Sequence, residues 1–148
     1  MSDQQWQVAG NAALASLATR YRLLIVSNVH RAGFAASNRH LRGRFAAVIT
    51  AEDVRAYKPA DNHFLALLGT LDDLGLARGE LLHVAQSLFH DHVPAGRAGL
   101  PSVWINRRHA RPGWGATPEP SERWSYDLEF PSLAEFAAAA DAAFAGPR

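Results

Sequence analysis

Four polar side chains that could do chemistry together lie just beyond runs of apolar residues. Ser27 and Asn28 end the segment LLIVSN, Lys58 lies in the segment AYKPAD, and Asp91 lies in the segment HVAQSLFHD. They supply a hydroxyl, an amide, an ammonium and a carboxylate, which can bind and act on a polar substrate when they converge in one cleft. We therefore expect a site for a small-molecule substrate, if the fold brings these segments together.

The apolar runs predict buried strands. They are nearly continuous rather than alternating, which is typical of strands covered on both faces in a parallel sheet. The predicted strands span Leu23–Val26, Ala46–Ile49, Leu81–Ala85 and Val103–Ile105.

Helical patterns lie between and after these strands. The clearest has leucines three, four, seven and ten residues after Phe64, and Gly75 supplies a stop in the left-handed conformation. The other predicted helices are His30–Leu41, Asp91–Ala98 and a last one that begins at the capping box of Ser132 and Glu135. Prolines and glycines oppose regular structure over residues 107–124, so a long loop is expected there.

This alternation of strands and helices predicts a three-layer, doubly wound α/β fold with a mostly parallel sheet. Such sheets bind ligands beyond the carboxyl ends of their strands. The polar residues at those ends are Ser27, Asn28, Thr50, Glu52, Gln86, Ser87, Asn106 and Arg107. Of these, we expect Ser27, Asn28 and Ser87 to bind the substrate.

The order and spacing of the segments resemble the haloacid dehalogenase (HAD) superfamily, and more closely its 2-haloacid dehalogenase-like branch. In that branch a strand ends in Ser-Asn, a later lysine stands in Tyr-Lys-Pro, and a further strand leads to a loop with one or two acids. The matching residues here are Ser27 with Asn28, Lys58, and Asp91. The segment EFPSLAEFAAAADAAF is similar to the family's last strand and helix, so the resemblance covers about residues 12–145.

The resemblance implies roles for these residues in a hydrolase. An aspartate of the family attacks the substrate and forms an ester, which water then hydrolyses. Ser27 and Asn28 would hold the substrate by hydrogen bonds, and Lys58 would keep the aspartate ionised. Asp91 would position Lys58 or the hydrolytic water. A receiver-like signalling domain does not fit, because its lysine follows the last strand and Lys58 does not.

One departure from the family concerns metal. Most phosphatases of the superfamily carry Gly-Asp at the positions of Ala85 and Gln86, and that aspartate helps to bind magnesium. A neutral amide is a poorer magnesium ligand than a carboxylate. We therefore expect no cofactor and no metal site, with magnesium disfavoured by Gln86, and a phosphatase is the less favoured activity.

A second departure concerns the nucleophile. The family's aspartate lies in an Asp-x-Asp or Asp-x-x-Gly-Thr segment after the first strand, and neither pattern occurs here. By resemblance, the first strand and the cap domain are missing, and that strand lies between those ending at Ser27 and at Ala85. Either Gln5–Ala9 fills the gap, another chain does, or the protein is a fragment. We expect this chain alone to be inactive, and the other hypothesis is a non-catalytic remnant or binding module.

Each site residue also has a structural interpretation. Ser27 and Asn28 could form a turn, Lys58 could be a solvated loop lysine, and Asp91 could cap a helix. His83, His90 and His92 lack the spacing of metal ligands, because His83 lies in a predicted strand and the other two flank one residue.

Composition limits the remaining alternatives. The 148 residues form one predicted domain, residues 1–148, and the 15 Lys and Arg nearly balance the 14 Asp and Glu. We therefore expect no nucleic-acid partner and no membrane partner. The absence of cysteine and of a leader-like or long apolar segment favours a cytoplasmic protein. Open sheet edges would favour a homodimer.

Overall fold

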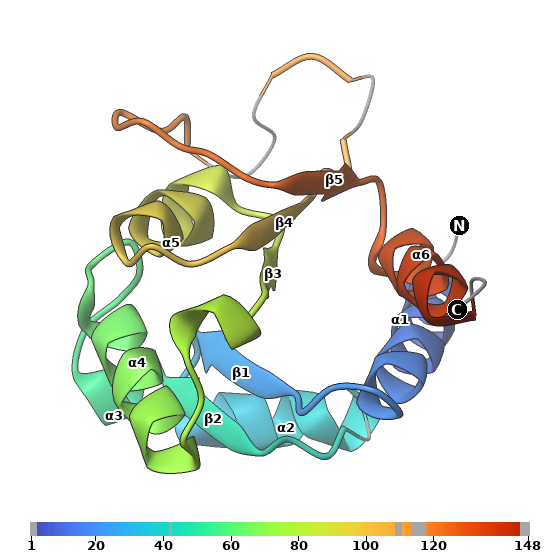
Figure 1. The fold of residues 1–148 in the computed structure, drawn as a ribbon, viewed down its shortest axis with the longest axis horizontal. Coiled ribbons are helices and arrows are strands. Elements are labelled where there is room, and N and C mark those ends of the chain that lie inside the picture. Colours follow the sequence, from blue (N-terminus) through green and yellow to red (C-terminus); the bar gives the residue numbers. More distant parts are fainter. Residues whose placement is uncertain (1–2, 42, 109–110, 114–117, 146–148) are drawn as a thin grey trace.

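The computed structural model describes residues 3–41, 43–108, 111–113 and 118–145 (Figure 1). Its strands are β1 (Leu24–Ser27), β2 (Ala47–Thr50), β3 (His83–Ala85), β4 (Ser102–Ile105) and β5 (Leu128–Phe130). Its helices are α1 (Asp3–Ala18), α2 (Arg31–Leu41), α3 (Ala51–Val54), α4 (Asn62–Leu74), α5 (Val93–Arg97) and α6 (Leu133–Ala145), with the short helices η1 (Arg78–Glu80) and η2 (Leu88–His92).

These elements confirm the predicted α/β fold. Each predicted strand is present within two residues of its expected bounds, and β5 lies where the family resemblance places the last strand. The described parts of residues 107–124 contain no helix or strand, as expected. Within the described residues, no helix is both long enough and apolar enough to cross a membrane.

The strands pair in parallel but form two sheets. One sheet consists of β1 and β2, and the other has the order β3-β4-β5. The break falls between β1 and β3, the strands that end at Ser27 and Ala85 (Figure 1). This is the position at which the resemblance predicts a missing strand, and the two neighbouring strands do not pair with each other.

The N-terminal segment does not fill that break, so this alternative is wrong. Residues Gln5–Ala9 belong to the helix α1. The helix α1 is rich in alanine, which has the highest helix propensity. Ala13 and Leu17 of α1 are buried in one cluster with Phe136 of α6, and Ser16 Oγ donates to Asp141 Oδ2 at 2.6 Å. Packing with α6 and with Val103 and Ile105 of β4 therefore places α1 in a helical layer beside the strands and not in the break between them.

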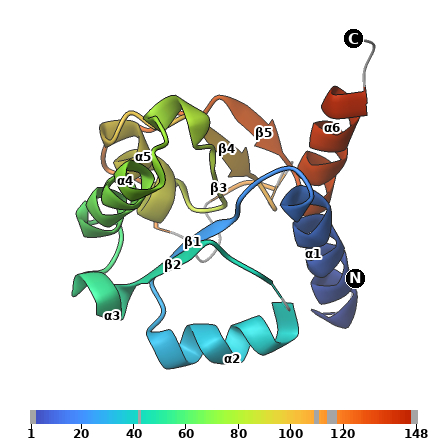
Figure 2. The same cartoon turned by 60° about the horizontal axis from the view of Figure 1, so that its bottom comes forward.

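Two buried clusters lie on opposite sides of the strands, which gives the predicted three layers. One lies beneath α4 and α5, and the other beneath α1 and α6 (Figure 2). The first consists of Ile49, Phe64, Leu67, Leu71, Leu81, Ala95 and Leu100. The second consists of Ala13, Leu17, Val103, Ile105, Phe136 and Ala137.

Gly69 inside α4 and Gly75 directly after it should respond to alanine in opposite directions. Gly75 ends the helix with φ +70°, and its amide donates to the carbonyls of Asp72 and Leu71. Gly75→Ala should lower the free energy of unfolding by about 1 kcal/mol, because a Cβ opposes that conformation. Gly69→Ala, inside the helix and with open space around the new Cβ, should raise it by about 0.5–1 kcal/mol. Urea unfolding measures both, and a stable Gly75→Ala variant would contradict the first expectation.

Candidate active site

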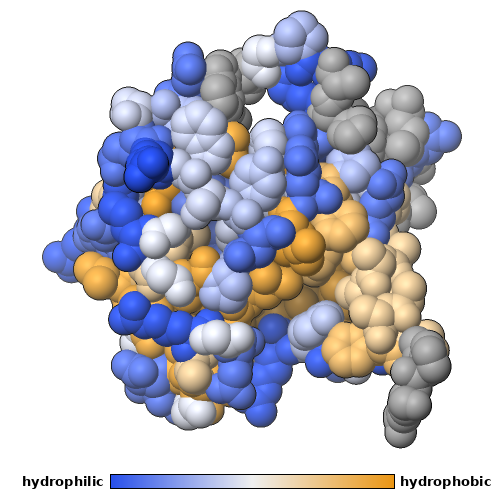
Figure 3. Space-filling model, turned by 45° about the horizontal axis from the view of Figure 1, so that its top comes forward, coloured by the Kyte–Doolittle hydropathy of each residue, from blue (hydrophilic) through white to orange (hydrophobic). Residues whose placement is uncertain are grey.

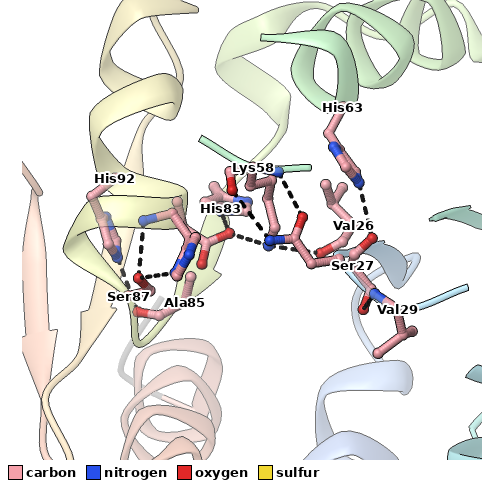
Figure 4. Close-up of polar contacts among 12 residues, drawn as sticks. Val26, Ser27, Val29, Lys58, His63, His83, Ala85, Ser87 and His92 are labelled. Carbon is pink, nitrogen blue, oxygen red and sulfur yellow. Dashed lines mark hydrogen bonds and ion pairs between the residues drawn. The ribbon is translucent and has the colours of Figure 1, made fainter. Parts of the chain in front are cut away.

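The predicted site residues meet at the carboxyl ends of β1 and β3. Ser27 and Asn28 come from the end of β1, Lys58 from the turn between α3 and α4, and Asp91 from η2 after β3. Figure 4 shows Lys58 between the end of β1 and the segment that follows β3. Parallel strands bring their carboxyl ends to one edge, which is why segments 30 residues apart can converge.

A buried ion pair forms the centre of the site. Lys58 Nζ lies 2.5 Å from Asp91 Oδ1, and the two side chains are only 9% and 10% exposed. The same ammonium donates to the carbonyl oxygen of Val26 at 3.2 Å. Lys58 is therefore not a solvated loop lysine, and its charge is held between β1 and η2.

Asn28 holds the backbone of Lys58 on both sides. The Lys58 amide donates to Asn28 Oδ1 at 2.6 Å, and Asn28 Nδ2 donates to the Lys58 carbonyl at 3.3 Å. The two bonds fix the turn that carries Lys58 relative to the end of β1. Asn28 therefore positions the lysine, and one N–H of its amide group is left for a substrate.

His83 is a third member of the charged cluster. Its Nε2 lies 3.4 Å from Asp91 Oδ1, within ion-pair distance but without the geometry of a hydrogen bond. Burial by itself would raise the pKa of Asp91, but the His83 imidazole and the Lys58 ammonium outweigh it and lower the pKa to about 2. Asp91 is thus a carboxylate throughout the neutral range.

The backbone around Asp91 adopts a π-helical turn. Ser87 precedes the turn, and its Oγ accepts from the His90 amide at 2.9 Å and lies 3.0 Å from His90 Nδ1. The predicted helix from Asp91 thus begins earlier, at Leu88, and changes from π to α at Val93. Single π turns occur often at functional sites. The Ser87 hydroxyl serves this turn, and its role toward a substrate stays a prediction.

Two further histidines support the strand ends from behind. His63 Nε2 lies 2.9 Å from the Ser27 carbonyl, and His92 Nε2 lies 2.9 Å from the Ala85 carbonyl (Figure 4). Both residues are fully buried. Burial lowers the pKa of each, which favours the neutral imidazole.

The Ser27 Oγ accepts from the Val29 amide at 3.3 Å, which leaves its O–H free to donate.

Other polar strand ends have different uses. Thr50 caps α3, where its hydroxyl accepts from the Asp53 amide. Glu52 forms an exposed ion pair with Arg31, and Asn106 donates to Glu129.

Sequence reasoning named the central residues of the site, Ser27, Asn28, Lys58 and Asp91, but missed His63 and the role of His83. His63 was detectable in part, because it lies four residues before Leu67 on the buried face of α4.

The donor set at this site does not suit magnesium. Asp91 already accepts from Lys58, and Gln86 lies on the surface with a neutral amide. Among the residues that the structure describes, no group of three or more His, Cys, Asp or Glu could hold a metal ion. Magnesium prefers carboxylate oxygens in near-octahedral geometry, which these residues do not offer.

Comparisons with known proteins identify the fold. No protein-family model matches the chain, and no curated protein matches it. Solved structures do match. A HAD phosphatase from Thermococcus onnurineus is 30% identical with a TM-score of 0.65, over 87% of this chain and 55% of that one.

Two other matches show the range of the neighbours. The L-2-haloacid dehalogenase from Xanthobacter autotrophicus, with chloropropionic acid covalently bound, has a TM-score of 0.70 at 20% identity, over 88% of this chain and 59% of that one. The magnesium-bound HAD-hydrolase YfnB from Bacillus subtilis has a TM-score of 0.69 at 21% identity, over 86% and 53%. The chain thus spans little more than half the length of these proteins. The chain therefore has the HAD fold, and HAD phosphatases and 2-haloacid dehalogenases are among its structural neighbours.

Proposed function

We propose that this chain carries part of the active site of a 2-haloacid dehalogenase-type hydrolase that works through an aspartyl ester. The observation that carries the proposal is the buried Lys58 ammonium, which bonds to Asp91 and to the Val26 carbonyl at the end of β1. A cation is costly to bury, so its presence beyond two strand ends favours a role toward an anionic group.

Each residue has a role in this proposal. Lys58 stabilises the attacking carboxylate in its ionised form, and Ser27 donates its O–H to the substrate carboxylate. Asn28 positions Lys58 through the two backbone bonds and has one N–H for the substrate. Asp91 fixes the lysine side chain. The carboxylate would displace halide from C2 of the haloacid, and water would then cleave the ester and restore the carboxylate.

The attacking carboxylate must come from outside these residues. Asp91 is already paired with Lys58, so it is a poor nucleophile. We therefore infer that the site is completed by a partner segment, and that this chain alone is inactive. Magnesium-dependent phosphatase activity is the less favoured alternative, because the donor set around Gln86 and Asp91 lacks a second carboxylate. The break between β1 and β3 also supports a second function, that of a non-catalytic binding module.

Halide release from 2-chloropropionate tests this proposal. The purified chain should release no halide above the buffer rate, and it should not hydrolyse p-nitrophenyl phosphate with magnesium present. Turnover by the purified chain that is lost in Lys58→Ala would show that the carboxylate lies within the chain. Phosphate release that survives in Lys58→Ala would remove the proposed role of the lysine.

A further inference from the structure

Lys58 is the only lysine in the chain, because all the other basic residues among its 15 Lys and Arg are arginines. Arginine presents a planar fork of donors, whereas lysine carries a compact ammonium on a flexible four-carbon stem. Such a stem lets the ammonium move whenever the backbone that carries it moves. The position of the turn before α4 therefore decides where the charge of Lys58 lies.

The end of β1 holds this turn from one side. The Val26 carbonyl accepts from Lys58 Nζ at 3.2 Å, and the Asn28 side chain bonds to the amide and the carbonyl of Lys58. The Ser27 carbonyl lies 2.9 Å from Nε2 of His63, at the start of α4. Three successive residues of β1 and the loop after it thus contact the turn and the first residues of α4.

Arg97, the last residue of α5, holds the same turn from the other side. Its Nη2 donates to the carbonyl of Pro59, the residue after Lys58, at 2.8 Å. Its Nε donates to Asp61 Oδ1 at 3.0 Å, and its Nη1 donates to Glu122 Oε2 at 2.6 Å in the segment that leads to β5. One planar guanidinium therefore joins two separate segments to α5.

Asp61 bonds to Arg97 and does not cap its own helix. It is the N-cap residue of α4, where an aspartate usually accepts from a backbone amide of the first turn. Its side chain makes no such bond here, because the carboxylate is turned to Arg97. The stabilisation that a side-chain cap would give α4 is absent, which favours a role for the Arg97–Asp61 bond outside the helix.

Arg97 forms a second link between the two segments that carry the buried ion pair. Asp91 lies in η2, which continues into α5 and ends at Arg97, whereas Lys58 and Pro59 are neighbours in the turn. The first link is the pair of Lys58 and Asp91 in the interior. The second is the bond from Arg97 to the Pro59 carbonyl near the surface. A movement of the turn away from η2 breaks both links.

The second link lies in polar surroundings. The Arg97 side chain is 37% exposed, and two of its partners, Pro59 and Glu122, line a shallow hollow together with Phe89, Val93 and Ser121. Figure 3 shows mostly hydrophilic side chains on the left, the side of α4 and α5, and a hydrophobic band across the middle of the same face. Exposed ion pairs contribute little to the stability of a whole fold. The contacts of Arg97 are therefore better suited to fixing the turn.

We propose that Arg97 is a positioning residue, which holds the turn of Lys58 against η2 and so keeps the Lys58 ammonium between Val26 and Asp91. The bond to Glu122 fastens the segment before β5 to the same point. The action of Lys58 on an attacking carboxylate rests on the proposed function, whereas the hold of Arg97 on Lys58 does not.

Acetylation of the only lysine tests this hold in the whole chain. Acetic anhydride reacts with Lys58 when its amine leaves the ion pair, and peptide mass spectrometry separates this product from that of the N-terminal amine. In Arg97→Met the acetylation rate of Lys58 should rise by about tenfold, because the turn loses bonds to a charged group and opens more often. Arg78→Met is the matched control. Arg78 also bonds the end of α5, at the Ala98 carbonyl, but joins it to η1, so this variant should keep the parent rate.

Amide exchange at Val103 separates positioning from stability. Val103 is fully buried in β4, so its amide exchanges through opening of the whole fold. In Arg97→Met this exchange should change little, because exposed ion pairs contribute little to global stability. An equal rise at Lys58 and at Val103 would mean that Arg97 only stabilises the fold. That result, or an unchanged acetylation rate in Arg97→Met, would overturn the proposal.

These outcomes are independent of the proposed chemistry. Phosphate release that survives in Lys58→Ala would remove the chemical role of the lysine, and faster acetylation in Arg97→Met would still support the hold. Equal acetylation in the parent and Arg97→Met would remove the hold and leave the role of Lys58 to the halide measurement.

Discussion

Lys58→Met is expected to lower the free energy of unfolding at neutral pH by about 3–5 kcal/mol, because it leaves Asp91 as a buried charge without its cation. Both side chains are about nine-tenths buried, so water cannot replace the lost partner. For a chain of 148 residues such a loss lowers the melting temperature by on the order of 10 °C. Chemical and thermal unfolding measure the effect.

The double variant Lys58→Met with Asp91→Asn tests the cause. It should regain a large part of the lost stability, because no charge is then left buried. Arg31→Met is a matched control, since Arg31 is likewise a cation paired with carboxylates, those of Asp53 and Glu52, but on the surface. It should change stability little. A Lys58→Met variant as stable as the parent would show that the ion pair contributes nothing, and that Asp91 is neutralised by other means.

The fate of this pair bears on function as well as on stability. A buried pair that could be replaced by apolar residues at little cost is weak evidence for a purely structural role. If the double variant is as stable as the parent protein, the fold does not need the pair, and its role lies at the site. The unfolding measurements thus separate what Lys58 does for the fold from what it does at the site.

Much of the fold follows from local patterns in the sequence. The leucines after Phe64 repeat at helical spacing, and α4 ends at Leu74, directly before the predicted stop at Gly75. The short apolar runs predict β1 to β4 because these strands are covered by other elements. Val26 packs against the first buried cluster, and Val103 lies in the second. The site residues follow from the same reasoning, since parallel strands end at a common edge.

The features that sequence reasoning missed depend on contacts between distant segments. Helix α1 has an alanine-rich sequence without a strong apolar face, and its position is set by packing on α6, more than 100 residues away in the chain. The closeness of His83 to Asp91 depends on the π turn that Ser87 begins. Such a turn has no periodic signal, because it consists of one short stretch whose bonds reach one residue further than in an α-helix.

Acid should destabilise the protein in two separate ranges. Burial lowers the pKa values of His63 and His92 in the folded chain. Below about pH 6.5 the unfolded chain therefore binds more protons at these two residues than the folded chain does. Stability is then complete above this pH and falls as the pH drops below it. The pKa of Asp91 is about 2 in the folded chain against 3.8 as its ordinary value. Its contribution, on the order of 2 kcal/mol, is present above about pH 4 and is lost as the pH falls toward 2.

Urea unfolding from pH 8 to pH 2.5 should resolve the two ranges, and single variants should assign them. Asp91→Asn should reduce the fall below pH 4, to which Asp53 and Asp141 also contribute through their lowered pKa values, and should keep the fall below 6.5. His92→Gln should weaken the upper fall and keep the lower, whereas His40→Gln, on the surface, serves as the control. A flat profile between pH 7 and 5 would mean that the buried histidines accept protons in place. His63 and His92 would then still hold the carbonyls of Ser27 and Ala85, because both nitrogens of a protonated imidazole are donors, and the strand ends of the site would keep their positions in acid.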